Sequence, residues 1–85
     1  MTTATKQTNR RAGAALKAVI REYGLSQNKV AAKMGYARST VNQWVNQSSD
    51  PLSDSIPDIF NALEDIEEGA GRKFISIFLN THSPV

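Results

Sequence analysis

The sequence predicts an all-α fold built as one compact domain. Apolar residues recur at the spacing of a helix face in several segments, and serine, proline and glycine residues stand where those segments begin and end. With 85 residues, the chain has room for a single hydrophobic core. We therefore expect five short helices packed around that core.

The first helix is expected between Ala12 and Tyr23. Residues 1–8 are rich in threonine and lack apolar periodicity, which indicates a mobile N-terminal tail. Beyond that tail, the apolar residues fall on one stripe of an amphipathic helix. Thr8 or Asn9 is suited to cap the first turn of this helix through a side-chain oxygen.

Two shorter helices are expected next. Ser26 stands at an N-cap position, and Gly35 ends the second helix. The third helix begins near Arg38 and ends by Ser48. The apolar residues that we expect these two helices to bury are Val30, Ala31, Met34, Val41, Trp44 and Val45.

A fourth helix follows a turn at residues 48–51, which are serine, aspartate and proline. We expect it to begin near Ser55, with Ser53 or Ser55 as its cap, because Pro57 fits only the first turn of a helix. Its apolar stripe continues to Leu63.

The last segment leaves two interpretations open. Apolar residues from Ile66 to Phe78 keep helical spacing, which favours a C-terminal helix within residues 67–80 and a short tail at 81–85. Gly69 and Gly71 weaken a helix by about 1 kcal/mol each relative to alanine. Residues 73–79 alternatively form a short strand.

This C-terminal segment is more apolar than one helix stripe requires. A helix that is apolar on most sides has to bury more than one face. We expect a second copy of the chain to cover the excess, with packing against the first helix as the alternative. The expected dimerisation residues are Phe74, Ile75, Ile77, Phe78 and Leu79.

Charge is unevenly distributed along the chain. Residues 1–46 hold eight basic side chains and one acidic, whereas residues 47–85 hold two basic and seven acidic. A basic half favours a polyanionic partner on that side, although an unevenly charged surface without such a partner gives the same count.

Composition argues against several functional classes. The chain has no cysteine and one histidine, which leaves no thiolate or histidine cluster for a metal site. It also has no phosphate-cradling glycine loop. We therefore expect no enzyme activity, cofactor or small-molecule ligand. No apolar run is long enough to span a membrane and no signal peptide is visible, so we expect a cytoplasmic protein.

The segment from Gln27 to Asn46 has the spacing of a helix-turn-helix. Ala31 supplies a small residue where two steeply crossing helices touch, and Gly35 supplies the positive φ that a short turn favours. Such a pair holds its second helix proud of the surface, where it can enter a major groove. The apolar anchors expected for this unit are Val30, Met34, Tyr36, Val41 and Trp44.

On these residues the sequence resembles the Cro/C1-type (Xre-like) helix-turn-helix family, which includes phage repressors. The resemblance covers roughly residues 10–66, and extends through Pro51 and the stretch from Ile59 to Leu63. It implies a compact five-helix, lambda-repressor-like DNA-binding domain at residues 9–66. It further implies that the third helix reads DNA.

The resemblance implies a set of DNA contacts in this chain. Arg38 suits the two acceptors of guanine, and either Gln43 or Asn42 suits adenine. The implied base contacts are Arg38, Ser39, Asn42 and Gln43. The implied backbone contacts are Gln27, Lys29, Thr40, Asn46, Arg10 and Arg11.

One departure from the family concerns the loop after the third helix. Many relatives carry Glu-Asn-Gly and then basic residues, whereas this chain reads Val-Asn-Gln-Ser-Ser-Asp from Val45 to Asp50. Asp50 would repel DNA if it lay close to a phosphate. We therefore expect modest affinity per domain and a corresponding need for dimeric binding.

The resemblance implies a sequence-specific binder of double-stranded DNA, a bacterial or phage transcriptional regulator that acts as a repressor at an operator. The alternative is a protein-interaction module, either an antitoxin-like protein or a helix-turn-helix that does not bind DNA.

Overall fold

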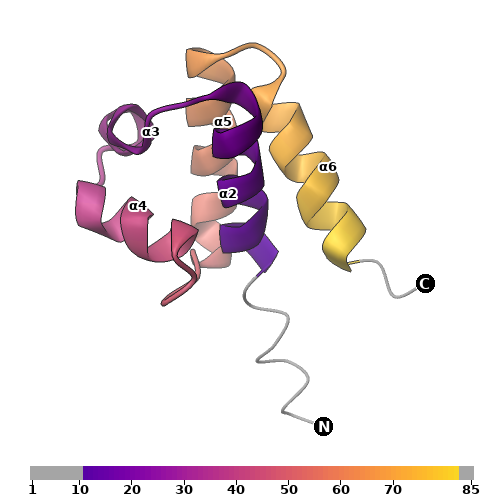
Figure 1. Ribbon diagram of the computed structural model, residues 1–85, viewed down its shortest axis with the longest axis horizontal. Helices are drawn as coiled ribbons and strands as arrows, with labels where there is room; N and C mark the ends of the chain where they lie inside the picture. Colours follow the sequence, from indigo (N-terminus) through magenta and orange to yellow (C-terminus); the bar gives the residue numbers. More distant parts are fainter. Residues whose placement is uncertain (1–10, 83–85) are drawn as a thin grey trace, which may run out of the picture.

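The computed structural model describes residues 11–82 and confirms the all-α fold (Figure 1). Within this range there are five α-helices, one short 3-10 turn and no strand, so the strand alternative for residues 73–79 is wrong. The expected tail at residues 1–8 lies outside the described range. The elements are α2 (Arg11–Tyr23), α3 (Gln27–Met34), α4 (Arg38–Val45), η1 (Ser53–Ser55), α5 (Ile56–Ile66) and α6 (Ala70–His82).

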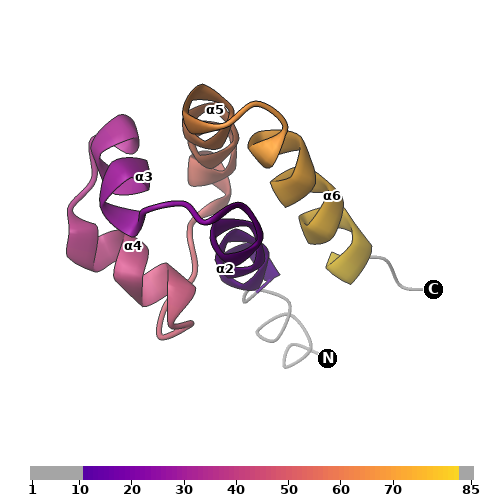
Figure 2. The same ribbon diagram turned by 45° about the horizontal axis from the view of Figure 1, so that its top comes forward.

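The helices form two groups around a central pair. Figures 1 and 2 both place α3 and α4 on one side of α2 and α5, and α6 on the other side. Helix α2 contacts α4 and α6, whereas α5 contacts α3 and α6. Helices α2 and α5 therefore lie between the helix-turn-helix, which consists of α3 and α4, and the C-terminal helix α6.

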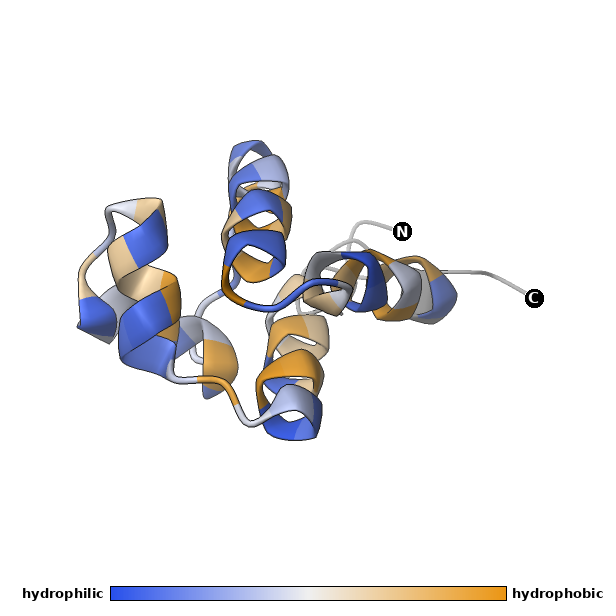
Figure 3. Ribbon diagram, turned by 90° about the horizontal axis from the view of Figure 1, so that it is seen from above, coloured by the Kyte–Doolittle hydropathy of each residue, from blue (hydrophilic) through white to orange (hydrophobic). Residues whose placement is uncertain are grey.

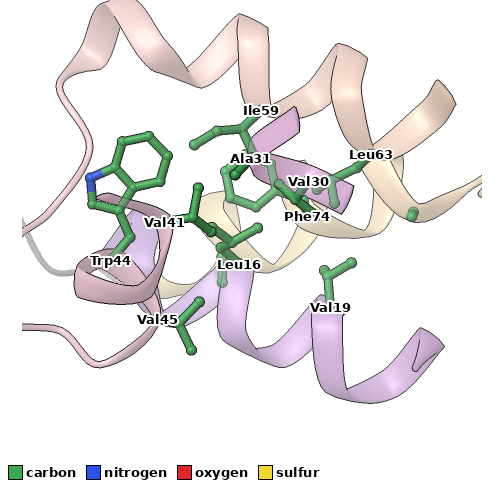
Figure 4. Packing of buried hydrophobic residues seen from close by; sticks show 12 residues of the cluster. Leu16, Val19, Val30, Ala31, Val41, Trp44, Val45, Ile59, Leu63 and Phe74 are labelled. Carbon is green, nitrogen blue, oxygen red and sulfur yellow. The ribbon is translucent and has the colours of Figure 1, made fainter. Parts of the chain in front are cut away.

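One hydrophobic core joins all five helices. Hydrophobic residues gather toward the middle of the molecule and hydrophilic residues lie outside, as Figure 3 shows. Figure 4 shows side chains from every helix meeting in this core. Its largest fully buried members are Leu16, Val19, Val30, Val41, Ile59, Leu63 and Phe74.

Helix α6 packs closely against the rest of the chain. Phe74 has no exposed surface, and its ring stacks on Phe78 with centroids 6.1 Å apart. A Cβ at Gly71 would lie 2.5 Å from the carbonyl oxygen of Phe60, so the missing side chain allows α6 to approach α5. The helix begins at Ala70 and continues to His82, two residues beyond the end expected from the sequence.

The first turn of α6 is capped by a side chain of the preceding helix. The carboxylate of Glu64 accepts hydrogen bonds from the backbone N–H of Gly69 (3.1 Å) and of Arg72 (3.0 Å). These bonds satisfy N–H groups that a helix start leaves without partners. They lower the pKa of Glu64 below its ordinary value, with a smaller contribution from the charge of Arg72. The carboxylate is therefore stabilised in its ionised form.

We expect Glu64→Gln to remove the contribution that the ionised Glu64 carboxylate makes to the free energy of unfolding. Because the folded-state pKa is depressed, the contribution is complete above the unfolded-state pKa of about 4.3 and is lost as the pH falls through the folded value. Urea melts of the native chain and the variant should differ most near neutral pH and converge at the acid end. Glu68→Gln, an exposed neighbour, is the matched control. Parallel curves for the native chain and Glu64→Gln would contradict this role.

Candidate DNA interface

The helix-turn-helix is closed at both ends of α3 by the residues expected. The Ser26 hydroxyl accepts a hydrogen bond from the N–H of Lys29 at 3.2 Å, which caps the first turn. Gly35 has φ 77°, a left-handed conformation that side chains disfavour. The N–H of Tyr36 then donates to the carbonyl of Ala31 at 2.9 Å. These bonds define where α4 begins relative to α3.

Buried side chains hold the helix pair against the domain. Val30 and Ala31 of α3 and the apolar side of α4 belong to the core (Figure 4). Tyr36 differs from the other expected anchors because it is 36% exposed. Its ring lies 5.4 Å from that of Trp44, and its hydroxyl is 3.1 Å from the Ser55 hydroxyl. Tyr36 therefore ties the turn to the start of α5.

All four expected base-contact residues lie on the exposed side of α4. The burial of Val41, Trp44 and Val45 turns the opposite side of the helix outward. At 3.6 residues per turn, the outward positions from 38 to 46 cover about 140° of the helix surface. Arg38 and Gln43 mark the edges of this arc. We call the exposed residues the reading face: Arg38, Ser39, Asn42, Gln43 and Asn46.

Hydrogen bonds already organise part of the reading face. The Arg38 Nη1 donates to Asn28 Oδ1 of α3 at 3.5 Å. The Asn46 Nδ2 donates to Asn42 Oδ1 at 3.4 Å. Asn42 thus has its oxygen engaged and its amide N–H groups left to donate. Among residues 11–82, the amide group of Gln43 makes no side-chain hydrogen bond and can both donate and accept.

The residues expected at the DNA backbone are less uniform. Lys29 is exposed, whereas Gln27 and Thr40 are half-buried at the starts of α3 and α4. Arg10 lies outside the described residues, and only the backbone of Arg11 is described, as the first residue of α2. Lys33, the other lysine of α3, pairs with Asp65 of α5 at 3.6 Å, which draws its charge toward α5.

Asp50 has a structural role that the sequence alone did not indicate. Its Oδ1 accepts a hydrogen bond from the N–H of Gly13 at 3.0 Å, so it caps the first turn of α2. The expected caps, Thr8 and Asn9, lie outside the described residues. Because 37 residues separate Asp50 from Gly13, no local pattern reveals the pair. Residues 27–49, which precede Asp50, carry three cations and no carboxylate.

At the end of α4, Gln47 stands where many relatives carry a glycine. Ser48 N–H donates to Gln43 O at 3.0 Å and Gln47 N–H donates to Trp44 O at 3.1 Å, which is the bond pattern of a Schellman motif. Gln47 occupies the left-handed position with φ 64°. It is the one non-glycine residue with positive φ within residues 11–82. The chain therefore stores strain directly after the reading face.

We expect Gln47→Gly to be more stable than Gln47→Ala by about 1 kcal/mol. Both variants lose the glutamine side chain, so their difference reports the strain of a Cβ at positive φ. Urea denaturation with a common slope measures it. Equal midpoints for the two variants would show that position 47 is not left-handed in solution.

Within residues 11–82, no three histidine or acidic side chains gather where they could hold a metal ion. The same residues include no helix of the length and hydropathy needed to cross a membrane.

Comparison with known proteins identifies a family for this chain. A helix-turn-helix family model matches residues 16–68, more than half of the chain. No curated protein and no solved structure matches the chain. The matched range includes α3, the turn, α4 and α5, and therefore the whole reading face. The chain belongs to the Cro/C1-type helix-turn-helix family of DNA-binding regulatory domains.

Proposed function

We propose that this protein binds double-stranded DNA sequence-specifically and represses transcription at an operator in a bacterium or phage. The reading face is the observation that supports this most directly. It presents an arginine, two asparagines, a glutamine and a serine on one exposed side of a helix that is anchored by buried side chains. Such groups match the donors and acceptors in the major groove, and the absence of carboxylates from residues 27–49 avoids repulsion by phosphates.

The hydrogen bonds of the reading face favour one assignment of bases. Arg38 reads guanine, because its guanidinium fork matches the O6 and N7 acceptors. Gln43 reads adenine, which requires one acceptor and one donor on the same amide. Asn42 is less suited to adenine because its oxygen is engaged by Asn46. Each bidentate pair contributes about 1–3 kcal/mol of discrimination against a wrong base.

Backbone contacts supply the remaining affinity. Phosphates at the edges of the groove lie within reach of residues at the starts of α3 and α4 and of exposed lysine. Uncharged and basic groups both serve there, since N–H and O–H groups donate to phosphate oxygens. The proposed backbone contacts are Gln27, Lys29, Thr40, Asn46, Arg10 and Arg11.

Dimeric binding is the second part of the proposal. Phe74 already lies within the chain's own core, so the surface offered to a partner comes from the rest of α6. Ile75, Ile77 and Phe78 are half-buried, and Leu79 is 55% exposed. A two-fold dimer through this surface would place two reading faces on half-sites about one helical turn apart. We place the proposed regulator in the cytoplasm, where it binds its operator.

Selection of binding sites from a random duplex pool tests the proposal. Enriched sequences are then titrated against scrambled DNA at two salt concentrations. We expect the native chain to select a palindromic motif. Arg38→Ala and Gln43→Ala should each reduce the base preference at one base pair of the half-site. Asn61→Ala, an exposed asparagine of α5, is the matched control and should bind like the native chain.

Two other results would contradict the proposal. Binding that falls with salt but enriches no motif would leave an electrostatic DNA binder without an operator. No binding at either salt concentration would favour the alternative, a protein-interaction module that retains the helix-turn-helix fold.

A further inference from the structure

Arg38 is the cation of the reading face, and its side chain contacts a residue of the other helix of the helix-turn-helix. It is the first residue of α4, and the helix carries no other basic or acidic side chain. Its Nη1 donates to Asn28 Oδ1, an oxygen on the second residue of α3. Both side chains are exposed on the same side of the helix-turn-helix. The contact therefore joins α3 to α4, the helix that carries the reading face.

The backbone around this contact is well defined at both ends. The Ser26 cap fixes the first turn of α3, on which Asn28 stands. The bond from Tyr36 N–H to Ala31 O fixes the turn, and the bond from Thr40 N–H to Ala37 O at 3.0 Å closes the first turn of α4. These bonds define where the backbones of Asn28 and Arg38 lie relative to each other, and the bond between the two side chains restricts the long arginine side chain.

The choice of a neutral acceptor matters for DNA binding. Guanidinium has five N–H donors in a rigid plane, and Asn28 engages one nitrogen, Nη1. The N–H groups on the other nitrogens remain available for the two acceptors of guanine. An amide oxygen orients the plane without neutralising the charge, whereas a carboxylate would compete with the phosphates for that charge.

We propose that Asn28 is a specificity-determining positioning residue, which orients Arg38 for guanine from outside the reading helix. This rests on the proposed function of Arg38 as a base reader. Restricting an arginine before binding reduces the side-chain entropy lost in the complex, by an amount that corresponds to roughly a three- to ten-fold change in affinity. The gain applies to the base pair that Arg38 reads and not to the rest of the operator.

A double-mutant cycle on the full chain tests this proposal. The probe is the selected operator duplex and three versions with the guanine position of Arg38 replaced by each other base pair. We expect Asn28→Ala to reduce discrimination at that position by roughly three- to ten-fold. Discrimination at the Gln43 position and the salt dependence should stay unchanged. In an Arg38→Ala background, Asn28→Ala should have no further effect on discrimination.

Charge variants give an independent readout. Asn28→Asp keeps an acceptor for Arg38 but neutralises the guanidinium, so we expect weaker binding and a salt slope smaller by about one. Asn61→Asp adds the same charge on α5, away from the reading face, and should leave the slope unchanged. Circular dichroism melts of each variant confirm that it is folded at the assay temperature.

The outcomes separate this inference from the proposed function. Equal discrimination by the native chain and Asn28→Ala would overturn the inference while Arg38→Ala still loses the guanine preference. A loss in Asn28→Ala that persists unchanged in the Arg38→Ala background would also overturn it, because Asn28 would then act by another route. If the native chain prefers no base at any position, the proposed function itself fails.

Discussion

Replacing Phe74 by alanine is expected to destabilise the domain by about 3–5 kcal/mol. The side chain has no exposed surface and packs from α6 into the core shared with α2 and α5. Truncation removes this buried ring and leaves a cavity that rigid neighbouring helices fill incompletely. A domain of this size has a total stability of about 4–13 kcal/mol. We therefore expect a large fall in the urea midpoint and partial unfolding near physiological temperature.

The matched control is Leu79→Ala, five positions along the same helix. Leu79 is 55% exposed, so the loss in a single chain should stay within about 0.5 kcal/mol. If α6 forms the proposed dimer, Leu79→Ala should instead weaken self-association, which sedimentation measures. A fall of less than about 1 kcal/mol for Phe74→Ala would contradict its place in the monomer core.

Gly13→Ala is the second large effect that we expect, a loss of about 2–4 kcal/mol. In an ordinary helix the same change stabilises by about 0.5–1 kcal/mol. Here a Cβ would lie 2.5 Å from the carbonyl oxygen of Trp44 and 3.0 Å from Asp50 Oδ1. The α4 backbone cannot move away without displacing the end of the reading helix, and the Asp50 carboxylate can move away only by breaking its bond to Gly13.

Two variants of Asp50 separate the clash from the cap. Asp50→Ala removes the hydrogen bond to Gly13 without adding volume, and should cost about 0.5–2 kcal/mol. Asp50→Asn retains an oxygen at the same place and should cost less. Thermal melts and DNA titrations of the three variants are compared. An unchanged or raised melting temperature for Gly13→Ala would show that α2 and α4 do not approach this closely.

Most helix positions could be predicted because their signals are local. Ser26 and Gly35 bracket α3 by capping chemistry, and Pro57 marks the first turn of α5. The family resemblance implied the base-contact residues of the reading face, and the burial of Val41, Trp44 and Val45 leaves that side of α4 exposed. These features depend on residues within one or two turns of each other.

Other features were missed because local patterns carry no sign of them. From the sequence, Gly71 predicts a weaker C-terminal helix, yet in the structure it allows α6 to pack closely on Phe60. From the sequence, Asp50 is a charge that would repel DNA if it lay close to a phosphate, whereas in the structure it caps α2. The bond of Asn28 to Arg38 also joins separate helices. In each case the two residues belong to different elements, at least ten positions apart in the chain, and become neighbours only when these elements pack together.

The sequence by itself determined the helices and the helix-turn-helix unit, because periodicity and capping act over a few residues. The polar residues of the reading face were implied by the family resemblance. Tertiary structure alone decided which of those polar groups are already bonded. It also decided that Phe74 belongs to the chain's own core and that the loop carboxylate of Asp50 bonds to α2. The physical reason is that hydrogen bonds and close packing require contact in space, and contacts between crossing helices arise only when the shared core assembles.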